Sequence, residues 1–510
     1  MMKKIEFTQN QLDILNDYSN NIIVSAGAGT GKTGVLVEKI QRELENNTSY
    51  KTIAGITFTI KAANEIKDRL LLENNDEVFI GTNNSFAIQE IITPFMWDIY
   101  GLQYRTDFDT NYLHKVNSFQ EGLEYMKTNK AICSYGDIKK NFVFELALDI
   151  LKKSQSAQLY LQSKYFKIFI DEYQDCDEAM NNLFMQINHD LNIKLFIVGD
   201  EKQSIYMWKG AVPSLFQSLL ENGIFKVYNI DLNFRCSQQI QNMSNILFDR
   251  TSDLYKSCDD KDSVNILKYQ NEIKFQKINE SLNKDLKTAI LAKTKKEAIK
   301  ICTELNKLGN DFIYIPQLPI DDLTSRDSWI YKAISDFYFL KNIYNFYEYM
   351  PIVGNEKDNL DMKDIKELQT ILNDLFLLVS NKELFNSKLN EIANFFDCEC
   401  NNDIVDLLLE TLVKDENKIA FSNTINKNQT LTLHSSKGKE FEQVIIFADD
   451  FNDVETDEGT LNLLYVAITR AKHRLIIATS SYDVPLIGSF FKNRFELLHI
   501  KSVDIINIIK

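Results

Sequence analysis

Two short segments, each placed directly after an apolar run, constrain this chain more than any other feature. The first, Ala26 to Thr33, reads AGAGTGKT and follows the apolar residues 21–24. The second is the acidic pair Asp171 and Glu172, which follows residues 167–170. Glycines at a strand-to-helix turn let backbone N–H groups point at phosphate oxygens. Together the segments predict a site for a nucleoside triphosphate, ATP, with Mg²⁺.

The length and charge of the chain limit the classes of protein that fit. A chain of 510 residues is too long for a single core, so two or more domains are expected. The net charge of −15 argues against a purely electrostatic nucleic-acid binder, but it leaves room for binding in a local basic groove. The start of the chain lacks the apolar core of a signal peptide, and no apolar run reaches membrane-spanning length. Seven scattered cysteines predict reduced thiols. We therefore expect a cytoplasmic protein that does not contact a membrane.

Alternation of short β-type runs with helical patterns predicts an α/β fold built on parallel sheets. The alternation stops twice, and each interruption has a mainly helical pattern. The chain is thus expected to have two α/β domains, each with a helical insertion. The predicted boundaries are residues 1–84 and 166–235 for the first domain, 85–165 for its insert, 236–316 and 427–510 for the second domain, and 317–426 for its insert.

Each residue of the glycine-rich segment has an expected task at the phosphates. Gly27, Gly29 and Gly31 would let backbone N–H groups approach the phosphate oxygens, and Ala28 and Thr30 complete the loop. Lys32 would neutralise the β- and γ-phosphates, and Thr33 would place its hydroxyl on Mg²⁺. Ala26 stands where such loops usually begin with glycine. The alternative, a glycine-rich turn with an incidental Lys-Thr, is disfavoured by the strand before it and the helix after it.

The acidic pair supplies the second half of this site. Asp171 would hold Mg²⁺ through water, and Glu172 would act as general base on the attacking water. Two like charges at a strand end are otherwise costly, which favours a function over the alternative of an exposed acidic turn.

Several further segments resemble the ordered motifs of UvrD-like superfamily 1A DNA helicases, so the α/β domains are expected to be RecA-like. The motifs occur in family order and lie in both α/β domains but not in the inserts. They are residues 7–11 (the Gln motif), 57–63 (motif Ia), 198–211 (motif III), 233–235 (motif IV), 432–441 (motif V) and 465–471 (motif VI).

The resemblance implies further contacts with the nucleotide. Gln11 would recognise the adenine edge, and Phe234 would stack on the base. Gln203 would couple the γ-phosphate to the DNA site. Arg235 and Arg470 would act as arginine fingers from opposite sides of a cleft between the domains. Gly438 and Glu440 would lie at the nucleotide, with Glu440 on the ribose.

The resemblance also implies a path for single-stranded or tailed DNA. Tyr206 and Trp208 would stack on bases, which tolerates any sequence. The expected lining of the path is Phe58, Lys61, Thr82, Asn84 and His434. Ordinary core packing is the alternative for the two aromatic residues, and a structural role is the alternative for His434.

Three functions are compatible with these features. The first is an ATP-dependent motor that single-stranded DNA stimulates and that moves 3′ to 5′, as members of the resembled family do. The second is an NTPase that senses DNA ends or single strands but unwinds little. The compact length resembles the UvrD-like subunit of the Gabija antiphage defence system, which works with an OLD-family nuclease. The third is a P-loop kinase or nucleotide-dependent scaffold without nucleic acid. Gly34 stands where many relatives have an arginine on the base, so nucleotide selectivity is expected to be relaxed.

Overall fold

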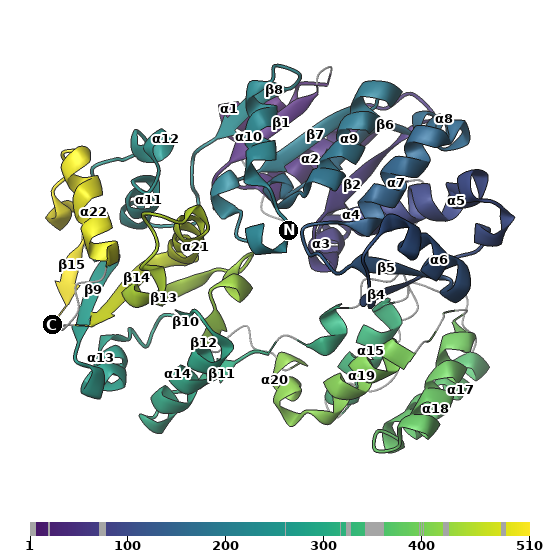
Figure 1. The fold of residues 1–510 in the computed structure, drawn as a ribbon. Helices are drawn as coiled ribbons and strands as arrows, with labels where there is room; N and C mark the ends of the chain where they lie inside the picture. Colours follow the sequence, from purple (N-terminus) through teal and green to yellow (C-terminus); the bar gives the residue numbers. More distant parts are fainter. Residues whose placement is uncertain are drawn as a thin grey trace.

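The computed structural model places the two halves of the chain around two separate β-sheets (Figure 1). It describes residues 7–18, 21–70, 78–260, 262–316, 318–322, 328–341, 362–396, 398, 400, 402–421, 428–480 and 486–509.

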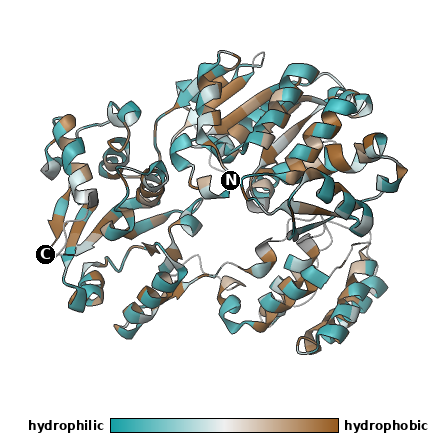
Figure 2. Cartoon of the chain, viewed as in Figure 1, coloured by the Kyte–Doolittle hydropathy of each residue, from teal (hydrophilic) through white to brown (hydrophobic). Residues whose placement is uncertain are grey.

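The first sheet has six parallel strands in the order β3-β2-β6-β7-β1-β8. Its four central strands carry near-continuous apolar runs, as a parallel sheet covered on both faces requires, whereas the edge strand β8 is mostly exposed. Figure 2 shows hydrophobic residues gathered on these strands and hydrophilic residues more frequent on the helices around them. The strands are Ile22–Ala26 (β1), Thr52–Thr57 (β2), Phe79–Thr82 (β3), Tyr165–Ile170 (β6), Lys194–Gly199 (β7) and Lys226–Ile230 (β8). The accompanying helices are Gln9–Leu15 (α1), Lys32–Glu45 (α2), Ile60–Leu70 (α3), Glu178–Leu191 (α9) and Pro213–Glu221 (α10).

The second sheet has seven parallel strands in the order β11-β12-β10-β13-β14-β9-β15. The strands are Val264–Tyr269 (β9), Thr288–Ala292 (β10), Phe312–Tyr314 (β11), Asn428–Thr432 (β12), Phe441–Phe447 (β13), Ala471–Ser480 (β14) and Asn507–Ile509 (β15). The accompanying helices are Gln238–Asn245 (α11), Asp249–Ser252 (α12), Lys274–Ser281 (α13), Lys295–Lys307 (α14), Glu458–Ile468 (α21) and Leu486–Leu497 (α22). The two parallel sheets confirm the predicted α/β class.

The segments between the strands of each sheet form the two inserts. The first insert contains α4 (Asn83–Ala87), a π-helix (Ile88–Ile92), α5 (Thr93–Tyr100), α6 (Phe119–Asn129), α7 (Phe142–Lys153) and α8 (Gln155–Lys164). It also contains a parallel strand pair that the sequence did not predict, β4 (Asp109–Val116) and β5 (Ala131–Tyr135). The described part of the second insert contains α15 (Ser328–Leu340), α17 (Met362–Leu377), α18 (Lys382–Phe395), α19 (Asn402–Val413) and α20 (Lys418–Phe421). The numerical boundaries of the domains remain a prediction.

The carboxyl ends of the strands in each sheet lie at one edge, since every pair in the two sheets is parallel. In the first sheet this edge carries the loops after β1, β6, β7 and β8. Ligands of open parallel sheets bind at such an edge. In the part of the chain that the structure describes, no helix has the length and apolar character needed to cross a membrane.

Candidate nucleotide and DNA site

The glycine-rich loop joins β1 to α2 and shapes a cradle for an anion. Gly29 and Gly31 adopt φ values of 72° and 84°, the left-handed region that favours glycine. The Thr30 hydroxyl donates to the Gly27 carbonyl over 2.9 Å, which tightens the turn. The first turn of α2 has no acidic residue and no side-chain cap. Its N–H groups and its dipole therefore remain available for an anion.

Lys32 pairs with one carboxylate by charge but makes no hydrogen bond among the described residues, which suits a phosphate. Its Nζ is buried, and within the described residues it has no hydrogen-bond acceptor. Glu172 Oε1 lies 3.6 Å away, too far for a hydrogen bond. A buried cation without an acceptor is costly, so the position suits an anionic ligand. Beside it, the Thr33 hydroxyl and the buried Asp171 carboxylate offer the oxygen ligands that Mg²⁺ prefers.

The two carboxylates after β6 have different electrostatic surroundings. Burial, reinforced by the neighbouring charge of Glu172, raises the pKa of Asp171. Burial also acts to raise the pKa of Glu172, but the charges of Lys32 and Lys437 outweigh it and lower that pKa. Gln174 donates a hydrogen bond to Glu172 Oε2 and fixes this carboxylate from the other side. Glu172 is thus held ionised and oriented, as a general base requires.

Gln11 lies on α1, directly against the phosphate loop. Its Nε2 donates to the Thr30 carbonyl over 3.1 Å, and its Oε1 accepts from the Thr8 N–H over 2.9 Å. Thr8 in turn caps α1 in a capping box, which anchors this helix start. The Gln motif therefore supports the loop in this structure, and adenine recognition by Gln11 remains a prediction.

The segment after β8 packs tightly on the phosphate loop. The Phe234 N–H donates to the Gly29 carbonyl over 2.9 Å, and the Phe234 ring is 58% exposed, free to stack on a base. A Cβ on Gly29 would lie 2.7 Å from the Arg235 Cβ, so the close approach requires glycine. Arg235 Nε donates to Glu440 Oε2 over 2.7 Å. Gly438, two residues before Glu440, has a φ of 78° and stands at a turn that glycine favours.

Arg470 lies at the same cleft but is held by its own domain. Its guanidinium donates to the Val466 carbonyl over 2.9 Å and to the Lys439 carbonyl over 3.0 Å. Burial, with the adjacent charge of Arg235, lowers the pKa of Arg470 to about 10. The structure brings the two predicted finger arginines, one from each predicted domain, close to each other. Their action as fingers from opposite sides of the cleft remains a prediction.

Lys437 is the functional residue for which sequence analysis assigned no role. It lies after β12 of the second sheet, yet its Nζ donates to Asp175 Oδ2 and to the Gln203 carbonyl of the first domain, the latter over 2.9 Å. It also lies 4.0 Å from Glu172. Burial raises the pKa of Asp175 to about 6, although Lys437 acts in the opposite direction. The available signal was the lysine in motif V, but its partner could not be identified from sequence.

Three predicted DNA-binding residues meet across the two domains. The rings of Tyr206 and Trp208 lie 6.4 Å and 6.1 Å from the ring of His434. Trp208 is 56% exposed, which disfavours the core-packing alternative for this residue. Burial, with the charge of Lys209, lowers the pKa of His434. The Lys437 ammonium lies 4.9 Å from the centre of the Tyr206 ring and joins this trio to the carboxylates.

The other predicted DNA contacts come from the first sheet. Phe58 follows β2 and packs partly against the core of this domain. The Thr82 hydroxyl caps α4 by accepting from the Ser85 N–H over 3.1 Å, which is a structural role. Asn84 is half-buried on α4. Lys61 belongs to α3, but its side chain lies outside the described part of the structure.

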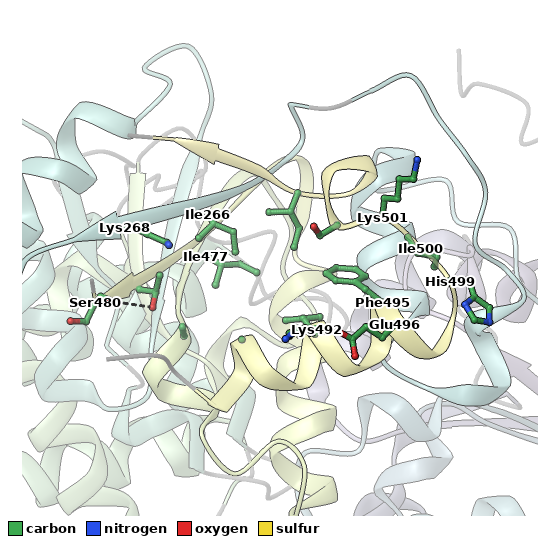
Figure 3. A pocket seen from close by; sticks show the side chains of 16 residues that line it. Ile266, Lys268, Ile477, Ser480, Lys492, Phe495, Glu496, His499, Ile500 and Lys501 are labelled. Atoms are coloured by element: carbon green, nitrogen blue, oxygen red, sulfur yellow. Dashed lines mark hydrogen bonds and ion pairs between the residues drawn. The ribbon is translucent and has the colours of Figure 1, made fainter. Parts of the chain in front are cut away.

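A separate cavity of about 900 Å³ lies in the second domain, between α22 and the strands β9 and β14 (Figure 3). Ile266, Ile477 and Phe495 face one another across it, with Lys268 and Lys492 near them. The predicted nucleotide and DNA residues are absent from its described lining. This cavity is therefore distinct from the place where the predicted nucleotide and DNA residues gather.

Comparisons with known proteins agree with this geometry. The AAA domain family matches residues 11–209, and the UvrD-like helicase C-terminal domain family matches residues 430–478. The chain is 40% identical over 494 residues to Gabija protein GajB of Bacillus cereus (strain VD045), across 95% of this chain and 97% of that protein. It is 26% identical over 459 residues to ATP-dependent DNA helicase Rep of Buchnera aphidicola subsp. Schizaphis graminum, across 76% and 66% of the two chains. A probable DNA helicase II homolog of Mycoplasma pneumoniae is 25% identical over 632 residues, across 94% and 86%.

The phosphate loop and the acidic pair lie at the edge of the first parallel sheet, and the aromatic trio joins this sheet to the second. These features are those of UvrD-like, ATP-binding and DNA-binding helicase proteins with two RecA-like domains. The predicted resemblance is confirmed. Within this class, the chain belongs to the family of Gabija protein GajB. This membership disfavours a P-loop kinase or a scaffold without nucleic acid.

Proposed function

We propose that the chain is an ATP-dependent motor that single-stranded DNA stimulates and that moves 3′ to 5′. The observation that carries the proposal is the position of Lys437. One ammonium group contacts Asp175 and the Gln203 carbonyl on the nucleotide side and lies over the Tyr206 ring on the DNA side. A strand stacked on Tyr206 would therefore be sensed at the carboxylates without any intermediate element.

Several of the predicted residues have a part in this mechanism. Bound ATP with Mg²⁺ would supply the phosphoryl group and the charge that the site is built to stabilise. Lys32 and the loop N–H groups would bind the phosphates, with Thr33 and Asp171 as the metal ligands. Glu172 would take the proton of the attacking water at its carboxylate. In the closed cleft Arg470 would act on the phosphates, and opening would shift the strand along Tyr206 and Trp208.

The exposed indole of Trp208 gives a direct test of DNA binding. Stacking of one base on an aromatic side chain is worth roughly 1–3 kcal/mol, so Trp208→Ala should weaken binding of oligo(dT) by about 5- to 150-fold. DNA-stimulated hydrolysis should fall at limiting DNA and recover partly at high DNA. Fluorescence anisotropy of labelled oligo(dT) measures the affinity.

The matched control for Trp208 is Trp97→Ala. Trp97 is 37% exposed on α5 of the first insert, so its removal also deletes a partly exposed indole. We expect oligo(dT) affinity to be unchanged in this variant. Equal affinity of wild-type protein and Trp208→Ala would contradict a stacking role.

The identity to Gabija protein GajB favours a second candidate function. In this alternative the chain is a cytoplasmic NTPase subunit of an antiphage defence complex that senses DNA ends or single strands and unwinds little, with an OLD-family nuclease as its expected partner. A strand-displacement assay on a 3′-tailed duplex separates the two functions. Displacement coupled to hydrolysis supports the motor, and DNA-stimulated hydrolysis without displacement supports the sensor.

Gly34 predicts the base selectivity of the site. A Cβ at this position would meet nothing within 4 Å, so a longer side chain can enter the space beside α2 without a clash. Gly34→Arg should raise the preference for ATP over pyrimidine triphosphates, because a guanidinium stacks well on an adenine face. The substitution also removes a helix glycine, worth about 1 kcal/mol of helix propensity. Hydrolysis of ATP, GTP, CTP and UTP by both proteins measures the change, and Gly34→Ala controls for helix propensity.

A further inference from the structure

The hydroxyl of Tyr465 connects the phosphate loop to the second domain. Tyr465 lies on α21 and is 4% exposed. Its Oη accepts from the Ala28 N–H over 3.0 Å and lies 3.3 Å from Asp200 Oδ2, to which it donates. The Ala28 methyl group also packs in the hydrophobic core of the second domain, together with the Tyr465 ring. A residue of the phosphate loop is thus bound, through both backbone and side chain, to the opposite domain.

Asp200 extends this contact into the catalytic groups. Its Oδ2 also accepts from Gln203 Nε2 over 2.7 Å, and its N–H donates to Gln174 Oε1 over 2.9 Å. Gln174 is the residue that donates to Glu172 Oε2. A continuous series of hydrogen bonds therefore runs from the phosphate loop to the predicted general base, and the Tyr465 hydroxyl is the member that comes from the second domain.

A second contact keeps α21 in place beside this series. Asn462, one turn before Tyr465, donates to the Ser204 carbonyl over 3.1 Å and is almost fully buried. Docking of α21 and formation of the Tyr465 hydrogen bonds are therefore expected to occur together. When the cleft opens, the Tyr465 hydroxyl must leave Ala28 and Asp200.

We infer that Tyr465 is a positioning residue that links domain closure to the hydrolytic arrangement. The inference rests on the proposed ATPase function. While α21 is docked, the hydroxyl holds the phosphate loop, Asp200, Gln203 and Glu172 in one arrangement, and the arrangement loosens as the domains separate. Tyr465 touches neither phosphate nor DNA in this account, so it acts on turnover and leaves ligand binding unchanged.

Tyr465→Phe tests the inference, because it removes only the hydroxyl. It leaves the buried Ala28 N–H without its acceptor while α21 is docked. The free-energy cost of such an unsatisfied donor corresponds to a rate about tenfold lower. We expect kcat for ATP hydrolysis at saturating oligo(dT) to fall about tenfold. KM for ATP and affinity for oligo(dT) should stay within about twofold of wild type, which is a change of about 0.4 kcal/mol or less in binding free energy. A merely structural role would lower DNA affinity and thermal stability along with kcat.

The matched control is Tyr135→Phe in the first insert. The Tyr135 hydroxyl also donates to a carboxylate, Glu145 Oε2, over 2.7 Å, but both residues belong to the same insert. This variant should keep the wild-type kcat. A wild-type kcat in Tyr465→Phe, or a fall in kcat matched by lost DNA affinity, would overturn the inference. If oligo(dT) fails to stimulate the wild-type protein, the proposed function fails instead, so the two failures are distinguishable.

Discussion

Replacing Lys32 by alanine is expected to lower DNA-stimulated ATP hydrolysis by about 10³-fold. Lys32 Nζ is buried with no hydrogen-bond acceptor among the described residues, and Glu172 Oε1 lies 3.6 Å away, so its N–H donors are available to the phosphates. Loss of one preorganised donor to developing transition-state charge typically has an effect of this size. The measurement is phosphate release at saturating ATP and oligo(dT).

Binding of DNA should survive this substitution. Lys32 takes no part in the contacts among Tyr206, Trp208 and His434, and Lys437 remains beside Glu172 to hold its charge. The affinity for oligo(dT), measured by anisotropy, should match that of the wild-type protein. Lys67→Ala, which removes an exposed lysine from α3 of the same domain, should keep full activity. Wild-type hydrolysis in Lys32→Ala would contradict the assigned nucleotide site.

The sequence predicted the central strands of both sheets well because these strands are buried on both faces. Such strands are continuous apolar runs, and residues 22–24 and 168–170 are almost fully buried in the structure. The pair β4 and β5 was missed because β4 mixes polar and apolar residues and its pairing register shifts between Thr110 and Lys115. An irregular parallel pair of this kind leaves no periodic pattern for sequence analysis to detect, although β5 is largely buried.

The site could be predicted only where its residues are neighbours in sequence. The phosphate loop and the acidic pair are local turns at strand ends, so residue type and spacing define them. The contacts of Lys437 with Asp175 and of Tyr465 with Ala28 join residues 262 and 437 positions apart. They depend on how the two domains dock, and the sequence pattern of either domain alone contains no information about that docking. The same reason explains why the closeness of Arg235 and Arg470 could not be predicted from sequence.

Replacing Arg470 by lysine is expected to lower hydrolysis by about 10³-fold with little change in nucleotide affinity. The guanidinium now spans the Val466 and Lys439 carbonyls, a geometry that the single ammonium of lysine cannot reproduce. A finger that stabilises charge only in the transition state affects kcat and not ground-state binding. Turnover with oligo(dT) and binding of a fluorescent ATP analogue separate the two effects.

Arg474→Lys is the matched control for Arg470. Arg474 lies on β14 and donates to the Ser281 carbonyl and to Gln443 Oε1, both over 2.7 Å and both within the second domain. Any loss in this variant should appear in thermal stability and not in turnover. Equal turnover of the Arg470 and Arg474 lysine variants would show that Arg470 has no special part in hydrolysis.

The closeness of Arg235 and Arg470 adds a test that single substitutions cannot provide. Arg235 donates to the Thr469 carbonyl over 3.3 Å, directly beside Arg470, and its charge lowers the Arg470 pKa. If both arginines act on the same phosphate in the closed cleft, the Arg235→Lys and Arg470→Lys effects on kcat should be strongly non-additive. The double variant should then be only slightly slower than Arg470→Lys alone. Fully additive losses in log kcat would instead mean that the two arginines act independently, and that their contact in this structure is not the arrangement in which hydrolysis occurs.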